Sequence, residues 1–207
     1  MFDLTGKTAF ITGAGSGIGE EIARSFAAQG AKVAVADMNL EAAQRVAGEI
    51  GSNATAVCVN VADVASVQDA IDTVVKTFGG ISILINNAGI GLVGNVEETS
   101  NEDWDRLLAV NVTGVFYCTK AAMPHLLANA HSSIVNIASV AGIRGGNPHL
   151  LYPTSNGAIV VSPTPKQGIG DKGRLMISII EYDSRNGRPS WACWHPRKLR
   201  LSGNGLH

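Results

Sequence analysis

The sequence has few cysteines and almost no net charge. Its three cysteines, Cys58, Cys118 and Cys193, are odd in number and lack metal-ligand spacing, which argues against a disulfide framework and against a metal site. We therefore expect reduced thiols in a cytoplasmic protein. The 16 basic and 17 acidic residues give a formal net charge of −1, so bulk charge offers no case for binding nucleic acid or a membrane surface.

Long hydrophobic runs are also lacking. No apolar stretch approaches the roughly 20 residues that a membrane-spanning helix needs. Asp3 and Lys7 interrupt the N-terminus, so we expect no signal peptide. What is present is a chain of 207 residues with 45% hydrophobic residues and 24 glycines. This length and composition predict one α/β domain with many tight turns.

The most informative stretch is the glycine-rich segment 12–19, TGAGSGIG, which follows a short apolar run at 8–11. Apolar residues then recur at helical spacing. A strand, a glycine-rich turn and a helix in this order aim backbone N–H groups and the positive end of a helix at a phosphate. A tight turn without a ligand is the alternative. The residues predicted to contact a dinucleotide here are Thr12, Gly13, Ser16, Gly17, Ile18 and Gly19.

An acidic residue supports the ligand-binding interpretation. Residues 33–36 predict a second strand, which ends in Asp37, 18 residues beyond Gly19. A carboxylate there can accept hydrogen bonds from an adenosine ribose. The glycine spacing fits TGxxxGxG and not GxGxxG.

Strand and helix patterns alternate along the rest of the first 157 residues. Apolar and β-branched runs predict strands at 54–59, 81–85 and 133–138. The alternation predicts a doubly wound parallel sheet, in a Rossmann-like arrangement of three α/β/α layers. Ligands of such sheets bind beyond the strand C-termini. The candidate residues that fall there are Gly13, Asp37, Asn60, Asn87 and Ser139.

Helix boundaries are also readable. Asn39 is placed to cap a helix at 40–47, which Gly51 ends. Another helix follows Asp63. Ser100 and Asp103 form a capping-box pattern at the start of a long helix. Its apolar residues are Trp104, Leu107, Leu108, Val112, Val115 and Phe116.

Residues 1–157 resemble the short-chain dehydrogenase/reductase family. The glycine-rich turn matches the family's cofactor-binding turn, and residues 86–89, NNAG, match its second motif. Asn111, in the sequence NVTG, matches the catalytic asparagine. Ser139 matches the serine that orients the substrate, and Tyr152, 13 residues later, matches the catalytic tyrosine. The resemblance adds Asn60, Val61, Asn87, Ala88 and Gly89 to the predicted cofactor-binding residues.

The resemblance implies hydride transfer between a nicotinamide and a small alcohol or carbonyl substrate. Ser139 would bind the substrate oxygen, Tyr152 would transfer the hydroxyl proton, and Asn111 would hold a water in a proton relay. A phenol titrates near pH 10, so it needs a neighbouring cation to act as a base at neutral pH. In the family this cation is a lysine four residues after the tyrosine.

Here that position holds Asn156, in the run YPTSN. An asparagine can bond a ribose hydroxyl, but it carries no charge that would stabilise a tyrosinate. The hypothesis is therefore an impaired alcohol dehydrogenase or ketone reductase. Two alternatives stay open: a noncatalytic NAD-binding or interaction protein, and an unstable truncated member of the family.

NAD is the expected cofactor in preference to NADP. Asp37 would accept from the ribose 2′-hydroxyl and repel a 2′-phosphate, and the glycine-rich turn contains no Arg or Lys. The family usually has an acidic residue where this chain has Asn60, beside the adenine. The Asn60 carbonyl can still accept from the adenine amino group, so we expect only a modest loss of affinity for the adenine.

Composition changes abruptly near the end of the chain. Residues 1–157 hold 8 basic and 14 acidic residues, whereas residues 158–207 hold 8 and 3. We divide the chain into an NAD-binding domain at 1–161 and a divergent segment at 162–207. That segment is either a nonnative or disordered tail, as from a shifted reading frame, or a divergent C-terminus with a binding role.

Only residues 175–180 predict a strand in this last part. No strand or helix period is visible from Glu181 onward, and Pro163 and Pro165 are expected to end the helix that includes Tyr152. The fifth strand would then have an exposed edge, which favours aggregation. The family's homodimer or homotetramer is expected only if the Tyr152 helix is intact.

Overall fold

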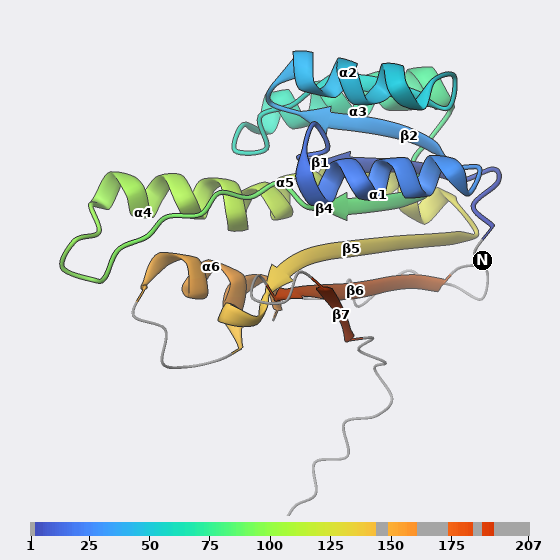
Figure 1. Cartoon of the computed structure of the whole chain (residues 1–207). Coiled ribbons are helices and arrows are strands. Elements are labelled where there is room, and N and C mark those ends of the chain that lie inside the picture. Colours follow the sequence, from blue (N-terminus) through green and yellow to red (C-terminus); the bar gives the residue numbers. More distant parts are fainter. Residues whose placement is uncertain (1–2, 144–148, 161–173, 184–187, 193–207) are drawn as a thin grey trace, which may run out of the picture.

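The computed structural model describes residues 3–143, 149–160, 174–183 and 188–192. Strands and helices alternate along the chain from β1 to α6 (Figure 1). The strands are β1 (Thr8–Thr12), β2 (Lys32–Asp37), β3 (Ala54–Cys58), β4 (Ile83–Asn86), β5 (His131–Ser139), β6 (Arg174–Asp183) and β7 (Arg188–Ala192). The helices are α1 (Gly17–Ala28), α2 (Leu40–Ile50), α3 (Val64–Phe78), α4 (Asn101–Leu108), α5 (Gly114–Ala128) and α6 (Leu151–Val160), with a π turn η1 (Ala109–Thr113) and a 3₁₀ turn η2 (Val140–Gly142).

The strands form one sheet in the order β3-β2-β1-β4-β5-β6-β7. Neighbouring strands from β3 to β6 are parallel, and β7 is antiparallel to β6. The chain runs from β1 outward to β3 and returns to β4 on the other side of β1. The strand order therefore reverses between β1 and β4, which is where doubly wound sheets bind their ligands. The predicted Rossmann-like fold is confirmed.

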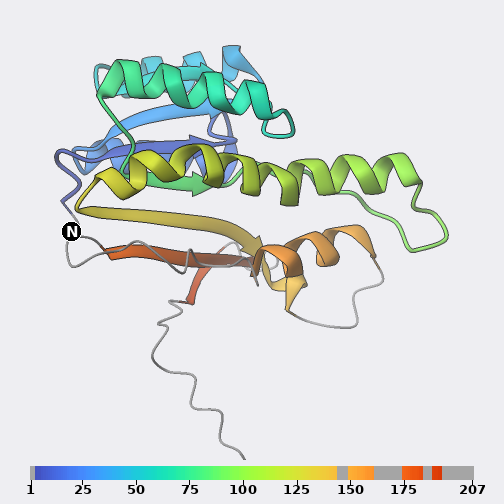
Figure 2. The same ribbon diagram turned by 180° about the vertical axis from the view of Figure 1, so that it is seen from behind.

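Alternate residues of the strands β1 to β5 face two separate apolar cores. Phe10 and Leu84 pack with residues of α3 and α5, which lie in front of the sheet in Figure 2. Ile11 and Val35 pack with residues of α1 and α2 on the opposite face. Successive strand side chains point to opposite faces, so a strand that is buried throughout feeds both cores. This gives the predicted three α/β/α layers.

Polar side chains begin the helices as the sequence predicts. The Asn39 side chain accepts a hydrogen bond from the Ala42 N–H, and Gly51, with φ of +90°, ends α2. The Ser100 hydroxyl accepts from the Asp103 N–H. Only this half of the predicted capping box is formed in α4, because the Asp103 carboxylate pairs with Arg106 at 3.0 Å.

The predicted long helix is divided. The π turn η1 separates α4 from α5 and carries Asn111. An extra residue in a helical turn rotates every later residue by about 100° relative to a continuous α-helix. Phe116, which the sequence groups with the apolar residues of this helix, is accordingly 57% exposed, whereas Cys118 is buried. The predicted long helix is therefore present, and the π turn inside it changes which of its residues are buried.

Two strands extend the sheet beyond β5: β6, which contains the strand predicted at 175–180, and β7, which the sequence does not predict. Residues 174–182 of β6 pair with residues 131–139 of β5, and β7 pairs with β6. The expected exposed edge on β5 and the absence of strands after Glu181 are therefore wrong. Strand pairing uses backbone N–H and C=O groups that every sequence supplies, so a strand can form without a visible side-chain period. The division at residue 161/162 remains a prediction; Val161, Pro163 and Pro165 lie outside the described residues.

The cysteines differ in exposure. Cys58 is exposed and Cys118 is buried, and burial raises the pKa of the Cys118 thiol to about 12. Cys193 lies outside the described residues. Within the described ranges, no group of three His, Cys, Asp or Glu residues could hold a metal ion. None of the helices in that part is long and apolar enough to cross a bilayer.

Candidate functional site

Two adjoining cavities lie where the strand order reverses. The β2-side cavity, of about 390 Å³, is lined by residues that include Ser16, Asp37 and Asn60. The α6-side cavity, of about 370 Å³, is lined by residues that include Tyr152 and Asn156. The two share a wall made of Ile18, Asn87, Ala88, Gly89 and Ile90. An elongated ligand can therefore extend from one cavity into the other.

Thr12 joins the glycine-rich turn to the loop after β4. Its hydroxyl accepts hydrogen bonds from the N–H groups of Asn87 and Ala88, both at 3.0 Å, and donates to the Ile85 carbonyl at 3.3 Å. The Asn87 amide donates in return to the carbonyls of Thr12 and Gly13, at 3.0 and 3.1 Å. The two segments that line both cavities are thus held as one unit.

Replacing Thr12 with valine should lower the free energy of unfolding by about 2 kcal/mol, because two partly buried N–H donors lose their acceptor. Thr12→Ser keeps the hydroxyl and loses one buried methyl, which costs about 1 kcal/mol. Urea unfolding of both variants measures the difference. Equal losses would mean that the hydroxyl does not hold the two segments together.

The N-terminus of α1 opens onto the β2-side cavity. Ser16 is the N-cap residue, and its side chain makes no capping hydrogen bond. Ser16, Gly17 and Ile18 all line the cavity. Gly13 has φ of +64°, and a Cβ there would lie 2.9 Å from the Ala88 Cα atom. The turn therefore presents the positive end of a helix to the cavity, with no room for side chains at its base.

Asp37 is fixed at the end of β2. One carboxylate oxygen accepts from the Gly15 N–H at 2.9 Å, and the other accepts from the Asn39 N–H at 2.9 Å. Each oxygen keeps a lone pair for a further donor. Asp37 lines the β2-side cavity beside the exposed side chain of Met38.

Asn60 and Val61 line the same cavity. The Asn60 side-chain oxygen accepts from the Ala62 N–H at 3.1 Å, so it has one lone pair left for a ligand. Val61 is buried and packs against α5, where a Cβ on Gly114 would lie 2.9 Å from a Val61 methyl carbon. Val61 therefore fixes the distance between the loop after β3 and the start of α5.

Asn111 connects three segments from the π turn η1. Its side-chain oxygen accepts from the Ile90 N–H at 2.8 Å, and its amide donates to the Ile90 carbonyl at 2.9 Å. The amide also donates to the Ser155 hydroxyl of α6 at 3.2 Å. The side chain thus ties the loop after β4 to α6 across the α6-side cavity.

Tyr152 and Asn156 lie on one face of α6, and both line the α6-side cavity. Tyr152 is 36% exposed, whereas Asn156 is buried. The Asn156 amide donates to the Tyr152 carbonyl at 2.9 Å, a bond within the helix. The described contacts thus give Tyr152 no cation from this position.

Ser139 ends β5, directly after Ala138, which lines the α6-side cavity. It is buried, and its hydroxyl accepts from the Ala141 N–H at 3.2 Å. The 3₁₀ turn η2 then passes close to α6, since a Cβ on Gly142 would lie 2.6 Å from the backbone of Asn156. Three predicted catalytic residues, Asn111, Tyr152 and Asn156, therefore line one cavity. The fourth, Ser139, follows the lining residue Ala138 directly in the sequence.

The sequence does not indicate one residue of the site, Ser155, nor the partners of another, Asn86. Ser155 accepts the bond from Asn111, and its position three residues after Tyr152 on a helix is the signal that could have indicated it. Asn86 belongs to the NNAG motif noted in the sequence, but its partners were not predicted: buried in β4, it donates to Asn136 at 2.8 Å and to Thr119 at 3.2 Å. No sequence pattern reveals this second contact set, because it joins residues 33 and 50 positions apart.

Comparisons with known proteins agree on one family. The family model described as short chain dehydrogenase matches residues 7–161. A meso-2,3-butanediol dehydrogenase from Serratia marcescens is 43% identical over 155 residues, which are 74% of this chain and 61% of that protein. A D-threitol dehydrogenase from Mycolicibacterium smegmatis is 41% identical over 162 residues, 77% of this chain and 62% of that protein.

A solved structure is also similar to this chain. It is a 3-ketoacyl-(acyl-carrier-protein) reductase from Brucella melitensis complexed with NADH, with a TM-score of 0.74 and 41% identity. The likeness covers 76% of this chain and 67% of that one. The chain spans about three fifths of the length of the two dehydrogenases above.

Proposed function

The chain belongs to the short chain dehydrogenase family, and from this premise we propose that it is an NAD(H)-dependent oxidoreductase. It interconverts a small secondary alcohol or polyol and the corresponding carbonyl compound. The observation that carries this proposal is the pair of adjoining cavities, with Asp37 in one and Tyr152 in the other. The diol and polyol named in the two relatives support the substrate class.

The residues present fit a nicotinamide dinucleotide. Asp37, with a free lone pair on each oxygen, would hold the adenosine ribose. The N-terminus of α1, where the Ser16 side chain makes no capping hydrogen bond, suits a pyrophosphate. Asn60 and Val61 would lie beside the adenine, and the shared wall at 87–90 leads on toward Tyr152. When bound, the cofactor supplies hydride transfer.

The chain's own residues handle the proton. Tyr152 is the group that exchanges a proton with the substrate hydroxyl, and Ser139 orients the substrate oxygen. Asn111 supports this arrangement by holding α6 against the loop after β4. A hydroxyl lowers the barrier to hydride transfer only if its proton points at the substrate oxygen. Because Tyr152 lies in α6, the position of this helix sets that direction.

Asn156 weakens this machinery. It brings no positive charge to the α6-side cavity, and its amide is bonded to the Tyr152 carbonyl. Turnover is therefore slow. Asn156 also favours a second candidate function, a noncatalytic NAD-binding protein. The homodimer or homotetramer and the cytoplasmic location are proposed along with the first function.

Replacing Asp37 with alanine should reduce the preference for NADH over NADPH by about 10- to 100-fold, because one charge that repels a 2′-phosphate is removed. Competition titrations with both cofactors measure this ratio. Asp37→Asn separates charge from hydrogen bonding, since it keeps one acceptor oxygen for Gly15 or Asn39. An unchanged ratio in both variants would contradict NAD preference through Asp37, and binding of neither cofactor by the wild type would contradict the proposed function.

A further inference from the structure

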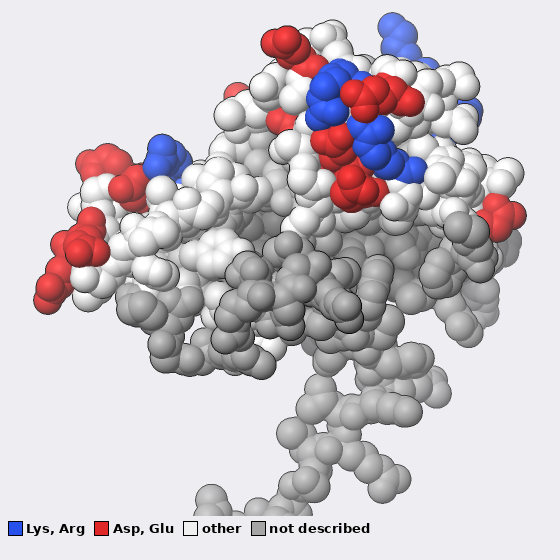
Figure 3. All heavy atoms as spheres, in the orientation of Figure 1, with Lys and Arg blue, Asp and Glu red and all other residues white. Residues whose placement is uncertain are grey.

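An ion-pair network joins α1 to α2 beside the glycine-rich turn. Glu20 of α1 pairs with Arg24 at 2.6 Å and with Arg45 of α2 at 2.8 Å. Glu49 of α2 pairs with Arg45 at 3.3 Å and also contacts Arg24. Figure 3 shows acidic and basic side chains gathered over these two helices. The two arginines therefore share the same two acidic partners.

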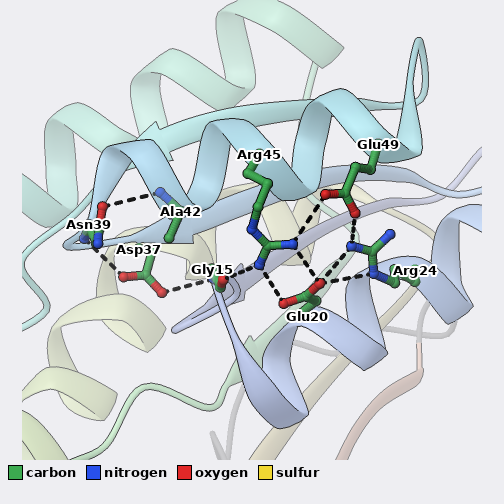
Figure 4. A network of polar contacts seen from close by, with 8 residues as sticks. All are labelled: Gly15, Glu20, Arg24, Asp37, Asn39, Ala42, Arg45 and Glu49. Carbon is green, nitrogen blue, oxygen red and sulfur yellow. Dashed lines mark hydrogen bonds and ion pairs between the residues drawn. The ribbon is translucent and has the colours of Figure 1, made fainter.

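Only one of the two arginines also reaches the turn. Arg45 donates to the Gly15 carbonyl at 3.1 Å (Figure 4). The N–H of the same glycine donates to Asp37 at 2.9 Å. Gly15 is thus held on both of its backbone polar groups, by a side chain of α2 and by the carboxylate at the end of β2.

The contact with Arg45 fixes the direction of a neighbouring donor. The Gly15 carbonyl and the Ser16 N–H belong to one planar trans peptide, in which the two bonds point in opposite directions. A carbonyl held toward Arg45 therefore turns the Ser16 N–H away from α2. Ser16 lines the β2-side cavity and caps α1, so this N–H is one of the donors at the end of that helix.

A side chain at position 15 could not take over the role of the Arg45 contact, because the turn has no space for one. A Cβ on Gly15 would lie 2.9 Å from both the Ala42 Cβ atom and an Asp37 carboxylate oxygen. Gly15 must therefore remain a glycine. A glycine is held only by its backbone contacts, because its φ and ψ angles are otherwise the least restricted of any residue.

The partners of Arg45 keep it in place. The hydrogen bond from Arg45, followed by that from Arg24, lowers the pKa of Glu20 to about 2. The carboxylate is therefore ionised at neutral pH. Because Glu20 lies in the first turn of α1, it also orients the guanidinium toward the turn that begins this helix.

We propose that Arg45 is a positioning residue for the dinucleotide: it holds the Gly15–Ser16 peptide so that the turn presents its N–H donors to the pyrophosphate and Gly15 stays bonded to Asp37. This rests on the proposed function. Arg24 has the same acidic partners, and its side chain donates to Glu20 and Glu49 and not to the turn. It provides the matched comparison, because its loss removes ion pairs from the same surface without touching Gly15.

The test compares Arg45→Met, Arg24→Met and Arg45→Lys in the whole chain. Hydrogen exchange of the segment 12–19 is followed without ligand, and NADH affinity is measured by fluorescence titration. We expect Arg45→Met to speed exchange in this segment and to weaken NADH binding by about 5- to 20-fold, part of the contribution of one charge-assisted hydrogen bond. Arg24→Met should change both by less than about twofold, although both variants lose ion pairs.

Arg45→Lys keeps the charge but not the fork that reaches Glu20 and Gly15 together, so it should fall between wild type and Arg45→Met. Equal effects of Arg45→Met and Arg24→Met on exchange and affinity would overturn the proposal and leave the proposed function intact. If the wild type binds no NADH, the proposed function fails and the positioning of a dinucleotide falls with it. Exchange in segment 12–19 then shows whether Arg45 still orders the turn.

Discussion

Replacing Asn156 with lysine is expected to raise kcat by about 100- to 1000-fold, equivalent to about 3–4 kcal/mol of electrostatic stabilisation of the transition state. Asn156 lies one helical turn after Tyr152, and both line the α6-side cavity of about 370 Å³. A longer side chain therefore has space to reach toward the phenol. The pH–rate profile should also move toward neutral pH, because a cation beside a phenolate favours the ionised form.

The control for this experiment is Asn156→Met, which lengthens the side chain without adding a charge. Both variants remove the bond from the Asn156 amide to the Tyr152 carbonyl, so any effect of that bond appears in both. Turnover is followed as NADH formation from a panel of small diols and secondary alcohols. If the wild type turns over as fast as Asn156→Lys, the idea of an impaired proton relay is wrong.

Replacing Gly19 with alanine is expected to lower the free energy of unfolding by about 3 kcal/mol or more, because the added methyl has no space. Its Cβ would lie 2.2 Å from the Gly13 carbonyl oxygen and 2.6 Å from the Asn87 side-chain nitrogen. Neither can retreat easily, since the Asn87 amide is bonded to Thr12 and Gly13. NADH affinity should fall by about 100-fold, because a displacement near 1 Å at a ligand contact has effects of that size.

Gly48→Ala is the matched control. Gly48 lies inside α2, and a Cβ there would meet nothing within 4 Å. This substitution should stabilise the protein by about 0.5–1 kcal/mol through helix propensity alone and leave NADH binding unchanged. Thermal unfolding and NADH titration of both variants give the comparison. A Gly19→Ala variant as stable as wild type would show that the α1 turn is not packed against the loop after β4.

The part of the site that the sequence predicted is the part built from short motifs. Thr12 and Asn87 belong to two local patterns, and the parallel sheet brings strand C-termini together. Their mutual hydrogen bonds follow from that arrangement. Asp37 was predicted for the same reason, since it ends a recognisable strand.

The contacts that the sequence could not predict depend on side chains meeting across elements. Arg45 has the ordinary appearance of a helix surface residue, and only the approach of α2 to the turn brings it to the Gly15 carbonyl. The π form of the helix at Asn111 was also not predicted, because an extra residue in a helical turn leaves the local composition unchanged. The strand at 175–180 was predicted and lies within β6, whereas β7 pairs through backbone groups and its side-chain pattern carried little information.

The measurement that tests the central claim most directly is a titration of the wild-type chain with NADH, followed by nicotinamide fluorescence. We predict saturable binding of one NADH per chain, with competition by ADP-ribose, because the residues that we propose to hold the adenosine and pyrophosphate line the β2-side cavity. Slow turnover would then be assigned to Asn156. A fluorescence signal that rises linearly without saturation would contradict the claim that these cavities form a dinucleotide site.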